Sequence, residues 1–141
     1  MNEDLRSCED VDAFLAGWRE DGNSMRRAFS LLCAEVAAMA DVSLQFVGRP
    51  GVSYSLRPKH RHQVGRDLFA MIDVIDDNPS ARWLSVCFYE DMITDPEGRG
   101  ECIPGGLAGA DGYCFDMNEY DDDLIGYLIA RLREAASAAA T

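Results

Sequence analysis

The sequence is short of cations: it has twelve arginines and one lysine against 25 acidic residues, which gives a formal net charge of −12. This charge disfavours nucleic acid and anionic membrane surfaces as general partners, because both would repel the chain at long range. No run of about 18 apolar residues occurs, so no membrane-spanning helix is expected. The first ten residues hold acids and no apolar run, so we also expect no secretory signal.

Closely spaced cysteine pairs are also missing, although the chain has five cysteines: Cys8, Cys33, Cys87, Cys102 and Cys114. An odd number without CxxC spacing, and without an export signal, predicts reduced thiols in a cytoplasm. The last three cysteines and the two histidines could meet at a zinc or iron ion. Their spacings lack the knuckles of a zinc site, so ordinary core cysteines are the favoured interpretation.

A length of 141 residues and a hydrophobic content of 48% are typical of one globular domain, which we expect to span residues 1–141. Ser7 and Asp10 resemble a capping box, and apolar residues at helical spacing follow it from Val11 to Trp18. A second helix is predicted from about Ser24 to Ala40. A third, after Asn118 or Tyr120, has acids in its first turn, and the tail AASAAAT should fray.

Between the second and third helices the hydrophobic period changes to two. Residues 42–46 and 52–56 predict a hairpin around the turn Arg49-Pro50-Gly51. Further strands are predicted over 68–75 and 82–89, and a short fifth over 113–115. Short links between successive strands favour an antiparallel meander. The predicted fold is therefore α+β, a two-layer sandwich with N-terminal helices, a four- to five-stranded mainly antiparallel sheet and a C-terminal helix.

The acidity of the chain is concentrated between Glu90 and Asp123, where eleven carboxylates face one cation, Arg99. Within this stretch we expect a long acidic, glycine-rich loop at about 90–112. The glycines do not lead into a helix, and no GKS or GKT follows them, which argues against a phosphate cradle. The alternating acids fail the spacing of a calcium loop. A loop of this length is the leading site candidate, and its acids of interest are Glu90, Asp95, Glu97, Glu101 and Asp111.

The counterpart of the acidic loop is the basic segment 57–66, RPKHRHQVGR, which contains no acid and both histidines. It is the one place in the chain where an anion would be attracted. A polar connection that pairs with the acidic loop of its own or of a neighbouring chain is the favoured alternative. The candidate anion- or partner-binding residues are Arg57, Lys59, His60, Arg61, His62 and Arg66.

Residues 112–136, GYCFDMNEYDDDLIGYLIARLREAA, resemble the ending of small YdhG-like bacterial domains of unknown function, which have been likened to frataxin. The resemblance covers about 25 residues and implies an α+β fold with an iron-handling role. On the first helix it implies candidate ligands Glu9, Asp10, Asp12, Glu20 and Asp21, since carboxylates suit hard cations. The acidic segment 91–111 departs from that family, whose members join these strands more briefly.

Three functions remain open from the sequence. The first is a non-enzymatic domain in a bacterial-type protein that binds a small ligand, a protein or a second copy of itself as a homodimer. The second is an iron- or divalent-cation-handling protein. The third is a small enzyme that uses segment 91–111 as a lid. No catalytic residue and no cofactor can be assigned from the pattern of residues.

Overall fold

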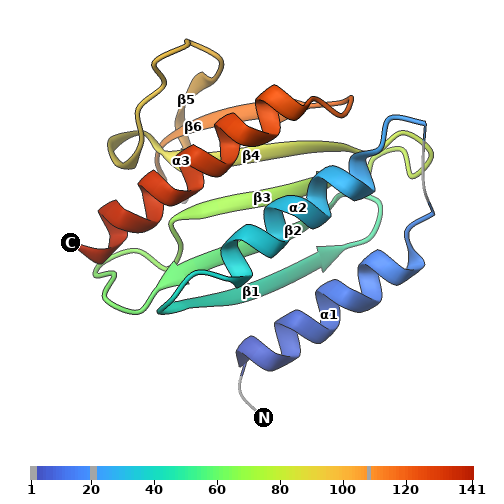
Figure 1. The fold of residues 1–141 in the computed structure, drawn as a ribbon, viewed down its shortest axis with the longest axis horizontal. Helices are drawn as coiled ribbons and strands as arrows, with labels where there is room; N and C mark the ends of the chain where they lie inside the picture. Colours follow the sequence, from blue (N-terminus) through green and yellow to red (C-terminus); the bar gives the residue numbers. More distant parts are fainter. Residues whose placement is uncertain (1–2, 20–21, 108) are drawn as a thin grey trace.

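The computed structural model describes residues 3–19, 22–107 and 109–141. Three helices and six strands form an α+β structure, with an antiparallel sheet in the order β1-β2-β3-β4-β6-β5. Figure 1 shows α2 and α3 in front of one face of the sheet and α1 beside β1, and the predicted α+β class with a C-terminal helix is confirmed. The elements are α1 Glu3–Gly17, α2 Met25–Ala37, β1 Val42–Arg49, β2 Ser53–His60, β3 Ala70–Ile75, β4 Trp83–Tyr89, the 3-10 helix η1 Glu90–Met92, β5 Glu101–Leu107, β6 Ala110–Met117 and α3 Asp122–Ala140.

The core lies between the helices and this face of the sheet. The predicted helical stripe of α2, including Phe29 and Leu32, is fully buried, as are Leu128 and Leu132 of α3. The sheet contributes alternate residues of its strands, so in β3 the positions of Ala70, Ile72 and Val74 are buried and those between them are half-buried. Burial of this apolar surface is the main stabilising contribution to the fold.

The sheet has six strands where four or five were predicted, because part of the expected loop at 90–112 is a strand. β5 has the sequence ECIPGGL, and every residue in it except Leu107 is exposed. Such a strand carries no alternating hydrophobic pattern. It forms by backbone pairing with β6, and Pro104 is tolerated because β5 is an edge strand that need not donate on its outer side.

Both ends of the helical layer differ from the sequence prediction. α1 begins at Glu3, before the expected cap at Ser7. α3 is capped by Asp121, whose Oδ1 accepts from the backbone N–H groups of Asp123 and Leu124 at 3.0 and 3.2 Å. The alanine tail remains helical to Ala140, because Ala135 and Ala139 pack into the core instead of fraying.

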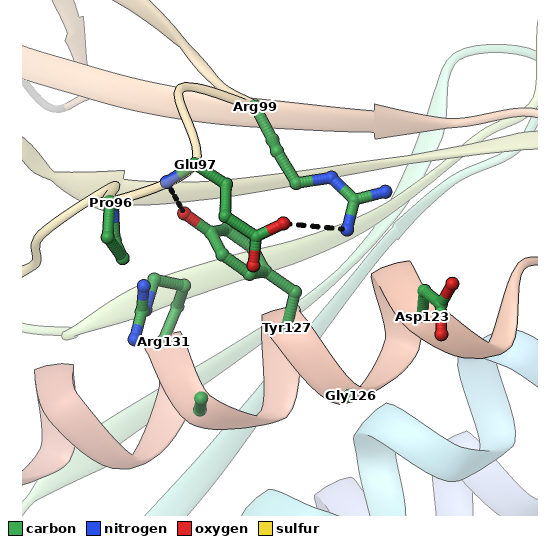
Figure 2. A pocket seen from close by; sticks show the side chains of 8 residues that line it. Pro96, Glu97, Arg99, Asp123, Gly126, Tyr127 and Arg131 are labelled. Atoms are coloured by element: carbon green, nitrogen blue, oxygen red, sulfur yellow. Dashed lines mark hydrogen bonds and ion pairs between the residues drawn. The ribbon is translucent and has the colours of Figure 1, made fainter.

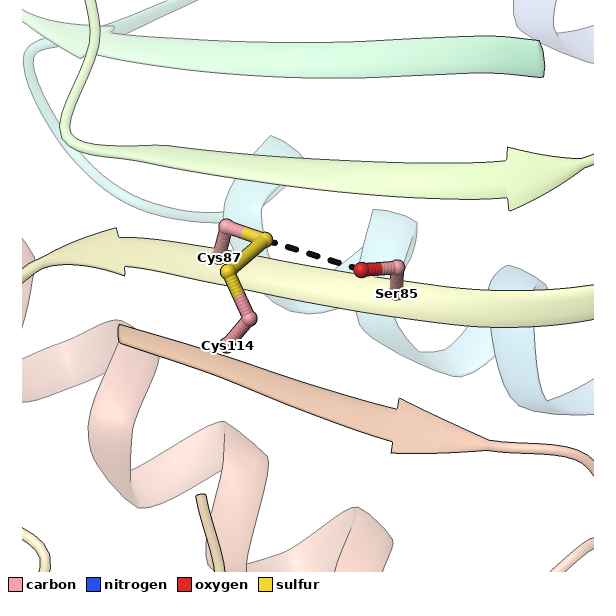
Figure 3. The surroundings of a disulfide bond; sticks show 3 residues. All are labelled: Ser85, Cys87 and Cys114. Carbon is pink, nitrogen blue, oxygen red and sulfur yellow. Dashed lines mark hydrogen bonds between the residues drawn. A yellow bond between two sulfur atoms is a disulfide. The ribbon is translucent and has the colours of Figure 1, made fainter. Parts of the chain in front are cut away.

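The cysteines also differ from expectation, since Cys87 and Cys114 form a disulfide across β4 and β6 (Figure 3). The two residues are 27 positions apart but directly opposite in the strand register. The prediction of reduced thiols is therefore wrong for this pair. Cys33 is a buried free thiol, and burial raises its pKa far above the ordinary value, which makes it unreactive.

Reduction of the protein should raise the number of titratable thiols by two, and the double variant Cys87→Ser/Cys114→Ser should show no such increase. The variant should also lose about 3 kcal/mol of unfolding free energy, because the bond closes a 27-residue separation in the unfolded chain. A thiol count with Ellman's reagent in denaturant and urea unfolding curves measure the two effects. Equal thiol counts before and after reduction of the natural sequence would contradict the disulfide.

Candidate functional site

The segment between η1 and β5, residues 93–100, is held against the helical layer by one carboxylate. Asp95 Oδ2 accepts from Tyr113 Oη at 2.7 Å and from the Gly100 N–H at 2.9 Å. Asp95 Oδ1 accepts from Tyr127 Oη and from the Arg99 N–H, the latter at 3.0 Å. Asp95 therefore joins this segment to β6 through Tyr113 and to α3 through Tyr127.

The charge on Asp95 is stabilised by these donors. Burial alone would raise the pKa of its carboxyl group, but the four hydrogen bonds outweigh burial and hold the pKa well below the usual range. The same contact raises the pKa of Tyr113, because its phenol donates to an anion. Asp95 is therefore ionised and Tyr113 remains a donor at neutral pH.

A close approach at Gly100 makes this arrangement possible. A Cβ atom at Gly100 would lie 2.5 Å from Cε1 of Tyr113 and 2.8 Å from Cε2 of Phe115. Only glycine lets the backbone N–H reach Asp95 without moving the two rings.

A second carboxylate fixes the start of the segment to α3. Glu134 accepts from both the backbone N–H and the hydroxyl of Thr94, each at 2.7 Å. Two neighbouring residues of the segment are thus attached to α3, Thr94 through Glu134 and Asp95 through Tyr127. The segment is built as a fixed wall rather than as a free loop.

Between this wall and α3 lies a cavity of about 810 Å³. Its centre is the ring of Tyr127, whose hydroxyl also accepts from the Glu97 N–H at 3.2 Å. The guanidinium groups of Arg99 and Arg131 lie 5.4 and 4.8 Å from the centroid of that ring (Figure 2). The lining residues are Pro96, Glu97, Arg99, Asp123, Gly126, Tyr127, Ala130 and Arg131.

Arg131 is the least satisfied polar side chain at this cavity. Its side chain is 12% exposed, and its Nε and Nη1 atoms are buried without a hydrogen-bond partner. The distance from Arg131 Nε to Glu134 Oε1 is 3.3 Å, which is close enough for an ion pair. The two groups are not aligned for a hydrogen bond, because the Glu134 carboxylate is directed at Thr94. Buried donors of this kind are costly, and native structures usually give them an acceptor.

The Arg99 guanidinium group also has hydrogen-bond donors without a close acceptor among the described residues. Its nearest carboxylates are those of Glu97 at 3.9 Å and Asp121 at 3.8 Å, which are ion-pair distances longer than hydrogen bonds. The side chain is 28% exposed. The cavity therefore holds two guanidinium groups with free hydrogen-bonding capacity, and two carboxylates, Glu97 and Asp123, at the same opening.

The acidic residues predicted as site candidates are not brought together. Asp95 and Glu97 belong to this cavity or its wall. Glu90 lies 3.8 Å from Cys102 Sγ, and Asp111 accepts from the Gly105 N–H at 3.1 Å within the β5–β6 hairpin. Glu101 points to the other face of the sheet, because it pairs with Cys114.

Three side chains of the basic segment 57–66, those of Lys59, Arg61 and Arg66, pair with acids of the same molecule. Arg66 binds Asp91 through two hydrogen bonds of 2.7 and 3.1 Å and stacks on Tyr89 with its Cζ 3.8 Å from the ring centroid. This contact holds the pKa of Asp91 below its ordinary value. Lys59 lies 3.7 Å from Asp67, and Arg61 lies 3.5 Å from Asp41. Arg57 Nε donates to Ser55 Oγ. His60 is buried, and its Nδ1 accepts from the His62 N–H.

The cavity was not predicted from the sequence, because its two central residues, Tyr127 and Arg131, fit the pattern of an ordinary helix. Tyr127 and Arg131 are four positions apart and share one face of α3. An aromatic residue followed by arginine at i+4, on a face where apolar residues would be expected, was the signal available.

No group of three or more metal-ligating side chains occurs within the described ranges. Of the residues implied by the frataxin likeness, Glu9, Asp10 and Asp12 are exposed on α1, whereas Glu20 and Asp21 fall outside the described residues. No helix among the residues searched is long and apolar enough to cross a membrane. Compared with protein-family models, curated proteins and solved structures, the chain matches none.

Replacing Asp95 with Asn should lower the unfolding free energy by about 2 kcal/mol, because a charged acceptor of four hydrogen bonds is lost and an NH₂ group is set against donors. Asp77→Asn, at an exposed position in the β3–β4 turn, is the matched control and should change stability by less than about 0.5 kcal/mol. Urea unfolding measures both. Equal effects of the two variants would contradict the role of Asp95.

The stability difference between the natural protein and Asp95→Asn should also depend on pH. The folded pKa of Asp95 lies below its unfolded value of about 3.9, so its contribution is present above that pH and is lost as the pH falls toward the folded pKa. The difference should be constant from neutral pH to about 5 and should narrow below about 4. A difference that grows on acidification would contradict this assignment.

Proposed function

We propose that this protein is a non-enzymatic binding domain, and that its ligand is a small molecule carrying both an anionic and a cationic group. The single observation that carries the proposal is the pair of arginines around Tyr127, with Arg131 Nε and Nη1 buried and without an acceptor. A carboxylate placed between Arg99 and Arg131 would supply the acceptors that the protein itself does not provide, once the Arg131 guanidinium group turns from its buried position toward the ligand.

The two carboxylates at the same opening favour a zwitterion over a simple anion. Glu97 and Asp123 line the cavity with Arg99 and Arg131, so the charges of the lining side chains balance. A ligand with a carboxylate and an ammonium group can satisfy both signs, whereas a plain anion would be repelled by the two acids. A volume of about 810 Å³ is within the usual size of small-molecule sites.

Preorganisation supports binding at this place. Asp95 and Glu134 fix the wall that carries Glu97 and Arg99, and the Cζ atoms of Arg99 and Arg131 lie over the ring of Tyr127. Groups that are already ordered lose less conformational entropy when a ligand arrives. We assign no reaction to the site, because binding requires neither a nucleophile nor a general base among the cavity residues.

Calorimetry with 4-aminobutyrate, butyrate and butylammonium tests the proposal, since the last two are the separate halves of the zwitterion. We expect 4-aminobutyrate to bind more tightly than either half, and Arg131→Gln to weaken its binding at least about tenfold, or about 1.4 kcal/mol. Glu97→Gln should weaken the zwitterion but not butyrate.

Arg133→Gln is the matched control, because Arg133 is on the same helix, is exposed and pairs with Glu35 at 2.7 Å away from the cavity. It should leave binding unchanged. Butyrate that binds as tightly as 4-aminobutyrate would overturn the zwitterion assignment. Equal binding by Arg131→Gln and the natural protein would overturn the site itself.

A further inference from the structure

The second face of the sheet is covered by no helix among the described residues (Figure 1). Strand register places on this face every second residue of each strand. Along the middle strands these are Met71 and Ile75 of β3 and Trp83 of β4, which are half-buried, and the Cys87–Cys114 disulfide. These apolar positions flank a polar row at the centre of the face, where Asp73 and Ser85 of the same two strands lie between them, and Met71 also packs against Leu68, Tyr89 and Leu107.

Charge on this face is divided between its two halves. On the β1–β2 side, the register pairs Arg49 with Ser53 and Arg57 with Gln45, so both arginines point to this face. Neither arginine makes an ion pair among the described residues. Arg57 is oriented by its Nε, which donates to Ser55 Oγ at 3.1 Å. This side therefore carries two cations that form no ion pair in the described part of the chain, although the charge of Arg57 already acts on Asp73 of the neighbouring strand and lowers its pKa against the effect of burial.

The opposite side, formed by β6 and β5, carries acids. Glu101 is opposite Cys114 in the register, and Asp116 lies two residues further along β6, so both point to the same face. Burial, and to a smaller extent the neighbouring charge of Glu101, raise the pKa of Asp116. The two acids repel each other, and no cation forms an ion pair with either in the described ranges.

A polar atom at the middle of the face is also unsatisfied. Asp73 of β3 stands between Ser55 and Ser85 in one cross-strand row that continues to Asp116. Its Oδ1 atom is buried and has no hydrogen-bond partner. A neighbouring surface that brought a donor to this row would remove the cost of that atom.

We propose that this sheet face is the interface of a homodimer, in which a second copy of the chain packs face to face. The charges select the symmetry. A two-fold axis parallel to the strands, passing between β3 and β4, places β2 of one copy over β6 of the other and β1 over β5. Arg57 then meets the acidic pair Asp116 and Glu101 of the second copy, twice by symmetry.

A two-fold axis across the strands is disfavoured by the same charges, because it would set β1 and β2 over their own copies and bring like charges together. In the favoured dimer β3 of each copy faces β4 of the other at the spacing of stacked sheets, about 10 Å, with Asp73 and Ser85 in the middle and the apolar positions to either side of them. The cavity at Tyr127 lies in the helical layer, so the dimer leaves it open. The inference is independent of the proposed ligand.

Sedimentation velocity of the full chain at low ionic strength tests the dimer. We expect the natural protein to dimerise, and Arg57→Asp and Asp116→Arg each to raise the dissociation constant at least about tenfold. The double variant Arg57→Asp/Asp116→Arg exchanges the two charges and should restore dimerisation to within a few fold of the natural protein. Arg133→Glu, in the helical layer, is the control and should have no effect.

Two results would overturn the proposal. One is a natural protein that remains a monomer at the highest concentration reached. The other is a dimer whose dissociation constant is unchanged by either single reversal, which would place the interface elsewhere. Circular dichroism of each variant shows whether it is folded, and restoration by the double variant distinguishes a charge contact from a folding defect.

Discussion

The structure around the cavity depends on one ionised carboxylate. Asp95 is held by two tyrosine hydroxyls and two backbone N–H groups, so a single side chain links segment 93–100 to both β6 and α3. Without it, Tyr127 would lose a partner that orients its ring, and the wall that carries Arg99 would lose its attachment to the helix. The site thus depends on an acid that does not line the cavity.

This arrangement explains how a strongly acidic chain can offer a place for an anion. Much of the acidity of residues 90–123 is used internally: Asp95 and Asp121 accept backbone N–H groups, and Asp91 binds Arg66. Acids engaged in this way favour local structure more than they attract cations. Arg99 and Arg131 line the cavity around Tyr127 together with Glu97 and Asp123, so the charges of its lining side chains balance.

The sequence predicted the elements with a strong hydrophobic period and missed those that depend on contacts across the chain. The α2 stripe and the β1–β2 hairpin were correctly predicted, because Phe29, Leu32 and Leu44 recur at spacings that burial requires. β5 was missed because ECIPGGL is exposed and forms only against β6. The disulfide joins residues 27 positions apart and the Asp95–Tyr127 contact joins residues 32 positions apart, and no local pattern encodes such pairs.

The central claim is that Arg131 and Arg99 together bind a ligand's carboxylate. The most direct measurement is a heteronuclear NMR titration that follows the arginine Nε–H signals while 4-aminobutyrate is added. The account predicts that the signals of Arg99 and Arg131 shift along one common saturable curve while that of Arg133 stays in place. An Arg131 signal that does not move, or that shifts without saturation together with every other arginine, would contradict it.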